Sequence, residues 1–159
     1  MTGTNQLYAV KKSEALTNGI TGTDLLVHGQ GVFIFKNDNN NFSCVFYIYN
    51  KDINNELKVE FTKNKIIVTR FPKNEELVDN YNKMGLVDSN GAFYWVSIDS
   101  QNQIIYAGIG EPRIETKKYS YSFPTENKDL WKENKLFLES LQTIIIPAES
   151  KYLRPLRVL

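Results

Sequence analysis

Hydrophobic residues recur mostly at every second position along the chain. The segment 56–62 alternates apolar with charged or polar residues, which is the pattern of a strand with one buried face. A second apolar run, 66–71, follows directly after Lys63 and Asn64. Two short strands across so short a polar junction predict a β-hairpin, with Asn64 in the positive-φ conformation that tight turns require.

Other apolar runs bounded by turn residues predict further strands. Both faces of residues 42–49 are apolar or aromatic, which favours a central strand covered on each side. The polar residues 100–102 predict a second hairpin turn, and Gly108 and Gly110 predict a bend or bulge after it. The remaining predicted strands are 32–35, 92–98, 103–107, 115–123 and 143–146.

One segment has helical spacing throughout. Thr125 or Asn127 can cap a helix over residues 127–141, in which the recurring apolar residues are Leu130, Trp131, Phe137, Leu138 and Leu141. A shorter helical turn is predicted from Glu75 to Tyr81, after Pro72 has ended a strand.

Many short strands with one late helix predict a mainly β fold, either an antiparallel β-sandwich or a jelly roll with one C-terminal helix. A chain of 159 residues is the usual size of a single domain, so we expect one domain over residues 1–159. Residues 147–159 follow the helix and are expected to form a C-terminal arm.

Composition narrows the partners and the compartment. Nineteen basic residues against 18 acidic ones leave a net charge of +1, so no nucleic-acid partner is expected. Signal-peptide and membrane-span patterns are both missing, which predicts a cytoplasmic protein without a membrane span, or a virion component. A single cysteine, Cys44, allows neither an internal disulfide nor a cysteine-based zinc site.

The chain offers little recognisable catalytic chemistry. Its one histidine, His28, is more typical of an exposed turn than of a catalytic base. Gly108 and Gly110 are followed by a predicted strand, whereas a phosphate-binding loop needs a helix there. The acidic and amide residues at 38–41 and 52–56 are better explained as solvated turns than as a cation site. We therefore predict no catalytic residue, no metal and no cofactor.

The densest aromatic group lies on three consecutive predicted strands. If one face of these strands is exposed, the rings form a stacking platform for a sugar ring or a flat apolar partner. The alternative is that they fill the core between two sheets. The aromatic residues are Tyr94, Trp95, Tyr106, Tyr119 and Tyr121, and the polar residues expected at the rim are Asp99, Gln101, Asn102, Glu111 and Arg113.

The same region carries a resemblance to a known family. The strand Phe93-Tyr94-Trp95-Val96-Ser97-Ile98, the turn at 100–102, the Ile-rich strand 103–106 and the glycine-containing bend at 107–112 resemble the β-sandwich module named after farnesoic acid O-methyltransferase. The similarity covers residues 31–123. It implies a binding or interaction domain and no methyltransferase activity. The Gly-Gly-Trp-Gly-like turn usual in that module is replaced here by residues 49–52.

These patterns favour a non-enzymatic binding module with a carbohydrate or a protein as its ligand on the aromatic face. A structural or assembly protein is the first alternative, such as a coat or virion component that forms a homo-oligomer through the C-terminal arm. The second alternative is a carboxylate-dependent hydrolase that uses Asp99 or Glu111.

Overall fold

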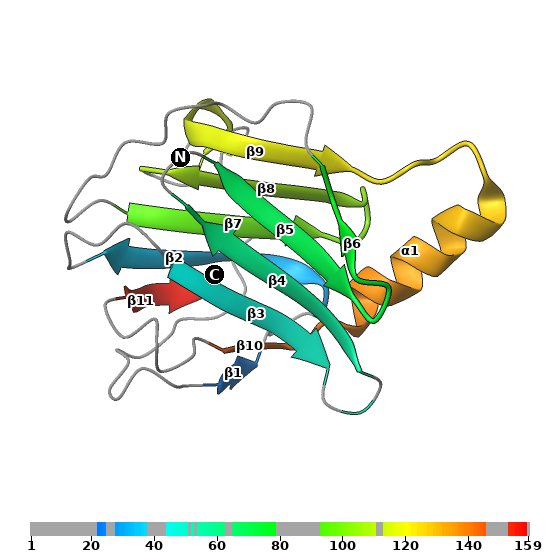
Figure 1. The fold of residues 1–159 in the computed structure, drawn as a ribbon, viewed down its shortest axis with the longest axis horizontal. Helices are drawn as coiled ribbons and strands as arrows, with labels where there is room; N and C mark the ends of the chain where they lie inside the picture. Colours follow the sequence, from blue (N-terminus) through cyan, green and yellow to red (C-terminus); the bar gives the residue numbers. More distant parts are fainter. Residues whose placement is uncertain are drawn as a thin grey trace.

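The computed structural model describes residues 22–24, 28–37, 44–50, 52, 54–62, 65–78, 93–110, 113–145 and 153–158. These residues form β-strands and one α-helix (Figure 1). In chain order the elements are β1 (Gly22–Asp24), β2 (Gln30–Asn37), β3 (Cys44–Asn50), β4 (Asn55–Phe61), β5 (Ile66–Phe71), β6 (Glu75–Glu76), β7 (Phe93–Asp99), β8 (Ile104–Ile109), the 3-10 turn η2 (Ile114–Thr116), β9 (Lys117–Ser122), α1 (Lys128–Ser140), β10 (Thr143–Ile145) and β11 (Leu153–Val158).

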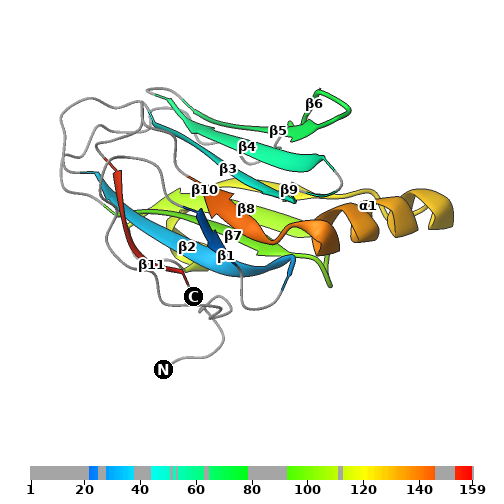
Figure 2. The same ribbon diagram turned by 90° about the horizontal axis from the view of Figure 1, so that it is seen from below.

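The strands form two antiparallel sheets that lie over one another (Figure 2). The six-stranded sheet has the order β1-β10-β3-β4-β5-β6, and the five-stranded sheet has the order β11-β2-β7-β8-β9. Every described strand pairing is antiparallel. The prediction of a mainly β sandwich with one late helix is confirmed.

Residues from both sheets meet in one hydrophobic core. The inward positions of β4 are Leu57, Val59 and Phe61, which are all buried. Across the interface the ring of Phe61 meets the ring of Tyr94 edge to face, with 5.2 Å between their centroids. The alternation in the sequence therefore sends the apolar set to the side where the second sheet removes it from water.

Both predicted hairpins are present. Residues 62–65 join β4 to β5, and the Thr62 N–H donates to the Lys65 carbonyl at 2.9 Å; Asn64 lies outside the described residues. The second hairpin joins β7 to β8. The predicted bend or bulge at Gly108 and Gly110 is also confirmed. The pairing of β8 with β9 shifts register between Ala107 and Gly108, and Gly110 has a φ of +109°.

Two predictions are corrected. In the described part of the predicted helical turn, Glu75–Glu76 is strand β6, and the Leu77 N–H donates to the Val68 carbonyl at 2.8 Å. The main chain is thus bonded to β5 and cannot form helical bonds. In the expected C-terminal arm, Leu153–Val158 is strand β11, which pairs with β2 at the sheet edge. Backbone hydrogen bonds hold that segment in the sheet, so it is no free arm.

Helix α1 lies at one end of the sandwich (Figure 2). Its N-cap is Asn127, one of the two caps that the sequence allowed, and the Asn127 Oδ1 accepts from the N–H groups of Asp129 and Leu130. Phe137 and Leu138 join the core from the helix. In the part of the chain that the structure describes, no helix is both long and apolar enough to cross a membrane.

Candidate functional site

Two rings of the predicted aromatic platform lie in the core between the sheets. Tyr94 and Tyr119 are both buried among residues of the main core. The Tyr119 hydroxyl donates to the Leu77 carbonyl, next to the six-stranded sheet, at 2.6 Å. This bond ties the two layers together, and it satisfies a polar group that burial would otherwise make costly.

Trp95 faces the other side of the five-stranded sheet and is also buried, with 0% of its surface exposed. Its Nε1–H donates to Thr116 Oγ1 at 3.1 Å. The indole lies over Gly108, where a Cβ would be 2.7 Å from the ring carbon Cζ2 and would clash with the Thr116 carbonyl. The partly buried Tyr106 packs against Trp95 and Val32.

Of the two alternatives that the sequence left open, burial supports the core for Tyr94, Trp95 and Tyr119, so these three residues are not part of an exposed platform. The first and last fill the inter-sheet core, and Trp95 is covered on its own face. Tyr106 and Tyr121 remain partly exposed. Lys117 Nζ lies 5.0 Å from the Tyr106 ring centroid, which is within cation–π range.

The predicted rim residues are not gathered in one place. Asp99 shapes the β7–β8 turn: its Oδ1 accepts from the N–H groups of Gln101 and Asn102, and its Oδ2 accepts from the Asn102 side chain at 2.8 Å. Arg113 is exposed but lies beyond the opposite end of β8. Glu111 lies outside the described residues. The geometry gives Asp99 a structural role.

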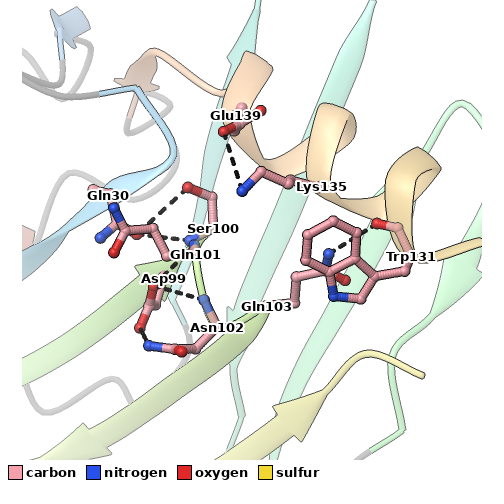
Figure 3. A network of polar contacts seen from close by, with 9 residues as sticks. All are labelled: Gln30, Asp99, Ser100, Gln101, Asn102, Gln103, Trp131, Lys135 and Glu139. Carbon is pink, nitrogen blue, oxygen red and sulfur yellow. Dashed lines mark hydrogen bonds and ion pairs between the residues drawn. The ribbon is translucent and has the colours of Figure 1, made fainter. Parts of the chain in front are cut away.

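The second tryptophan is the partly exposed one. Trp131 lies on α1 and lines an open hollow of about 520 Å³. The other residues that line it are Thr125, Lys128, Asp129 and Lys132. Lys135 Nζ lies 5.2 Å from the Trp131 ring centroid and also pairs with Glu139 at 3.8 Å (Figure 3).

The backbone of Trp131 is held from two sides. Its N–H donates to the Asn127 carbonyl at 2.8 Å, and its carbonyl accepts from Gln103 Nε2 at 2.8 Å (Figure 3). Gln103 is fully buried at the end of the β7–β8 turn, where its φ is +54°. Sheet and helix together therefore hold the backbone of Trp131 in place.

A second concavity lies on the other flank of α1, where β4 begins and β5 ends. It is a groove of about 570 Å³. Its lining residues are Asn55, Arg70, Pro72, Lys73, Glu133, Leu136, Phe137, Glu139 and Ser140. Leu136 is 68% exposed, although a leucine is usually buried.

Arg70 is the unusual residue of this groove. It is only 5% exposed; its Nη1 donates to the buried Asn134 Oδ1 at 2.7 Å, and its Cζ lies 4.1 Å from the Phe137 ring centroid. Sequence reasoning missed it. The available signal was an arginine at an inward position of β5, in step with Ile66 and Val68.

Charges around the groove affect one another. Burial lowers the pKa of the Arg70 guanidinium, and the nearby Glu75 and Glu133 partly oppose that shift; arginine still keeps its charge in proteins. A hydrogen bond from Lys73 Nζ at 2.7 Å lowers the pKa of the Glu133 carboxyl. Glu133 is thus neutralised mainly by the exposed Lys73.

Other candidate chemistry is sparse in the described ranges. His28 is exposed in the turn before β2, as the sequence suggested. Within the residues that the structure describes, no group of three or more His, Cys, Asp or Glu side chains could hold a metal ion. The burial of Glu56 raises its carboxyl pKa.

Comparisons with known proteins add little. No protein-family model matches the chain, and no curated protein sequence matches it. One solved structure with some likeness is the apo Crh5 transglycosylase, at 11% identity and a TM-score of 0.33 over 98% of this chain and 79% of that chain. A superposition that loose assigns neither a fold family nor an activity.

Proposed function

We propose that this chain is a non-catalytic binding module, and that its ligand is a saccharide that stacks on Trp131. The observation that carries the proposal is a partly exposed indole in an open hollow, next to exposed side chains that can form hydrogen bonds. A pyranose ring has an apolar C–H face and a rim of hydroxyl groups. An indole surrounded by polar side chains complements both.

The rim of the hollow supplies donors and an acceptor. Lys128 and Lys132 can donate to sugar hydroxyls, and the Asp129 carboxylate can accept from them. All three are exposed on the first turns of α1. The proposal keeps the binding role that the resemblance to the farnesoic acid O-methyltransferase module implies, and it moves the ligand surface from the sheet to the helix.

Titration of tryptophan fluorescence tests the proposal directly. Short β-linked oligomers of glucose, xylose and N-acetylglucosamine should include one that changes the emission in a saturable way. Trp131→Ala should weaken its binding about tenfold, which corresponds to about 1.4 kcal/mol for a lost stacking contact. Because a benzene ring still stacks, Trp131→Phe should retain most of the affinity, which is then measured by calorimetry.

The competing surface is the outer face of the five-stranded sheet, where Lys117 lies beside Tyr106. Lys117→Ala should leave the saccharide affinity unchanged. If Lys117→Ala weakens binding and Trp131→Ala does not, the sheet face is the ligand surface. A panel that gives no binding at all, by fluorescence and by calorimetry, contradicts the saccharide proposal.

A further inference from the structure

Arg70 places a positive charge at an inward strand position where the alternating pattern predicts an apolar side chain. Arg70 follows Ile66 and Val68 on the inward face of β5, and it lies where α1 covers the end of the sheet. Its guanidinium is packed against the ring of Phe137, with Phe123 further away at 5.8 Å. Moving a charge out of water costs several kcal/mol unless partners replace the lost solvent.

The partners that the structure supplies leave most of the guanidinium unused. Of the five N–H donors of an arginine, the side chain of Arg70 uses one, in the bond to Asn134, and its Nε is buried without a partner. In the described part of the chain, no carboxylate forms an ion pair with Arg70. Native buried donors are seldom left unpaired, so the buried Nε–H of an arginine that lines an open groove is the observation that points to an anionic ligand.

The groove around Arg70 limits which anion fits. Leu136, Phe137 and Pro72 give it apolar walls. On its rim, Glu133 is paired with Lys73 and Glu139 with Lys135, so a dianion such as a phosphate monoester would exceed the single charge of Arg70 and be repelled by the two carboxylates. A carboxylate carries one charge and matches the planar fork of a guanidinium with two parallel hydrogen bonds.

We propose that this groove is a second ligand site, in which Arg70 binds the carboxylate of a small apolar monocarboxylic acid and Leu136 contacts its apolar body. The site lies on the opposite flank of α1 from Trp131 and does not depend on saccharide binding. Arg70 is held in place for this role by Asn134 and by the Phe137 ring, which orient the guanidinium before the ligand arrives.

The experiment uses the full chain labelled with ¹⁵N and three probes of equal chain length: octanoate, octanol and octyl phosphate. Octanoate should shift the Arg70 Nε–H resonance and the amide signals of residues 133–140. Octanol and octyl phosphate should each bind at least about tenfold more weakly than octanoate. Octanol lacks the negative charge, and octyl phosphate carries two charges where the site matches one. N-acetyl-leucine, compared with its amide, tells whether a peptide C-terminus is accepted as a source of the carboxylate.

Variants assign the effect to Arg70. Arg70→Gln should weaken octanoate binding at least about tenfold, the usual scale for a lost charge-assisted hydrogen bond. The matched control is Arg113→Gln, which removes the same charge from an exposed position outside the groove and should bind octanoate as the natural chain does. Circular dichroism shows whether each variant is folded.

A second pair of variants covers the case in which Arg70→Gln does not fold. Leu136 is exposed, so Leu136→Glu and Leu136→Gln should both fold, and only the glutamate places a new negative charge beside the carboxylate. Octanoate should bind Leu136→Glu about fivefold or more weakly than Leu136→Gln. Equal binding to the three octyl probes, equal affinity of Leu136→Glu and Leu136→Gln, or no response at Arg70 Nε–H overturns the proposal; Arg70 then only anchors α1 to the sheet.

Discussion

The two tryptophans of the chain have opposite surroundings. Trp95 lies in the middle of β7, has 0% of its surface exposed, and gives its one N–H to Thr116. Trp131 lies on the solvent-facing flank of α1 and lines an open hollow. Periodicity locates both residues on their elements. What differs is the cover: a 3-10 turn and a glycine lie against the first indole, whereas in the described part of the chain the second indole has Lys135 Nζ at 5.2 Å and lines an open hollow.

The largest expected difference between them is in stability. Trp95→Ala should lower the free energy of unfolding by about 3–5 kcal/mol, because it leaves a cavity in a packed site and removes a large buried surface. Trp131→Ala should lower it by about 1 kcal/mol or less, as is usual for a partly exposed position. Guanidinium denaturation followed by far-UV circular dichroism measures both. Equal losses would show that the two indoles are buried alike.

The contact between Gly108 and Trp95 provides the next test. Gly108→Ala should lower the free energy of unfolding by about 1–3 kcal/mol, because the new methyl group meets the indole and the Thr116 carbonyl. The same substitution should shift the Trp95 emission to longer wavelength as the ring is displaced toward water. The emission is measured in a Trp131→Phe background, and an unchanged spectrum with unchanged stability would mean that the site is loosely packed.

Removing the hydrogen-bond acceptor of Trp95 should have a smaller effect. Thr116→Val keeps the shape of the side chain but leaves the buried Nε1–H unpaired, at a cost of about 1–2 kcal/mol. The control is Thr125→Val in the hollow of Trp131, where the side chain is exposed and stability should change by less than about 0.5 kcal/mol. Thermal unfolding of the two variants side by side makes the comparison.

The smallest effect concerns pH and helix α1. The bond from Lys73 lowers the Glu133 pKa below its ordinary value of 4.5. The stability that this pair adds is therefore present above that value and is lost as the pH falls through the lowered pKa. Because the pair is exposed, the loss should be small and screened by salt. The free energy of unfolding of Glu133→Gln is compared with that of the natural chain at pH 7 and at pH 3. The difference should be larger at pH 7; a larger difference at pH 3 would contradict the expected pH dependence.

Local pattern was a good guide to the elements and a poor one to the site. The hairpin across residues 62–65 and the cap at Asn127 follow from turn and capping chemistry, which act within a few residues. Strand β6 was missed because two glutamates have no strand preference, and only pairing with Thr69 and Arg70 makes them a strand. Strand β11, within the expected arm, was missed for the same reason, because its pairing partner β2 is far away in the sequence.

The sequence by itself determined the β-rich class, the two hairpins, the glycine bulge and the one helix, because alternation, turn residues and caps are local signals. Only the tertiary structure decided which aromatic rings meet water. Alternation places Trp95 on the face opposite Tyr94, but η2, whose Thr116 accepts from Trp95 Nε1–H on that face, is a distant segment whose position no local pattern contains. Likewise, Arg70 becomes a buried cation only when α1 closes over the end of β5, and burial depends on which segments pack together in space.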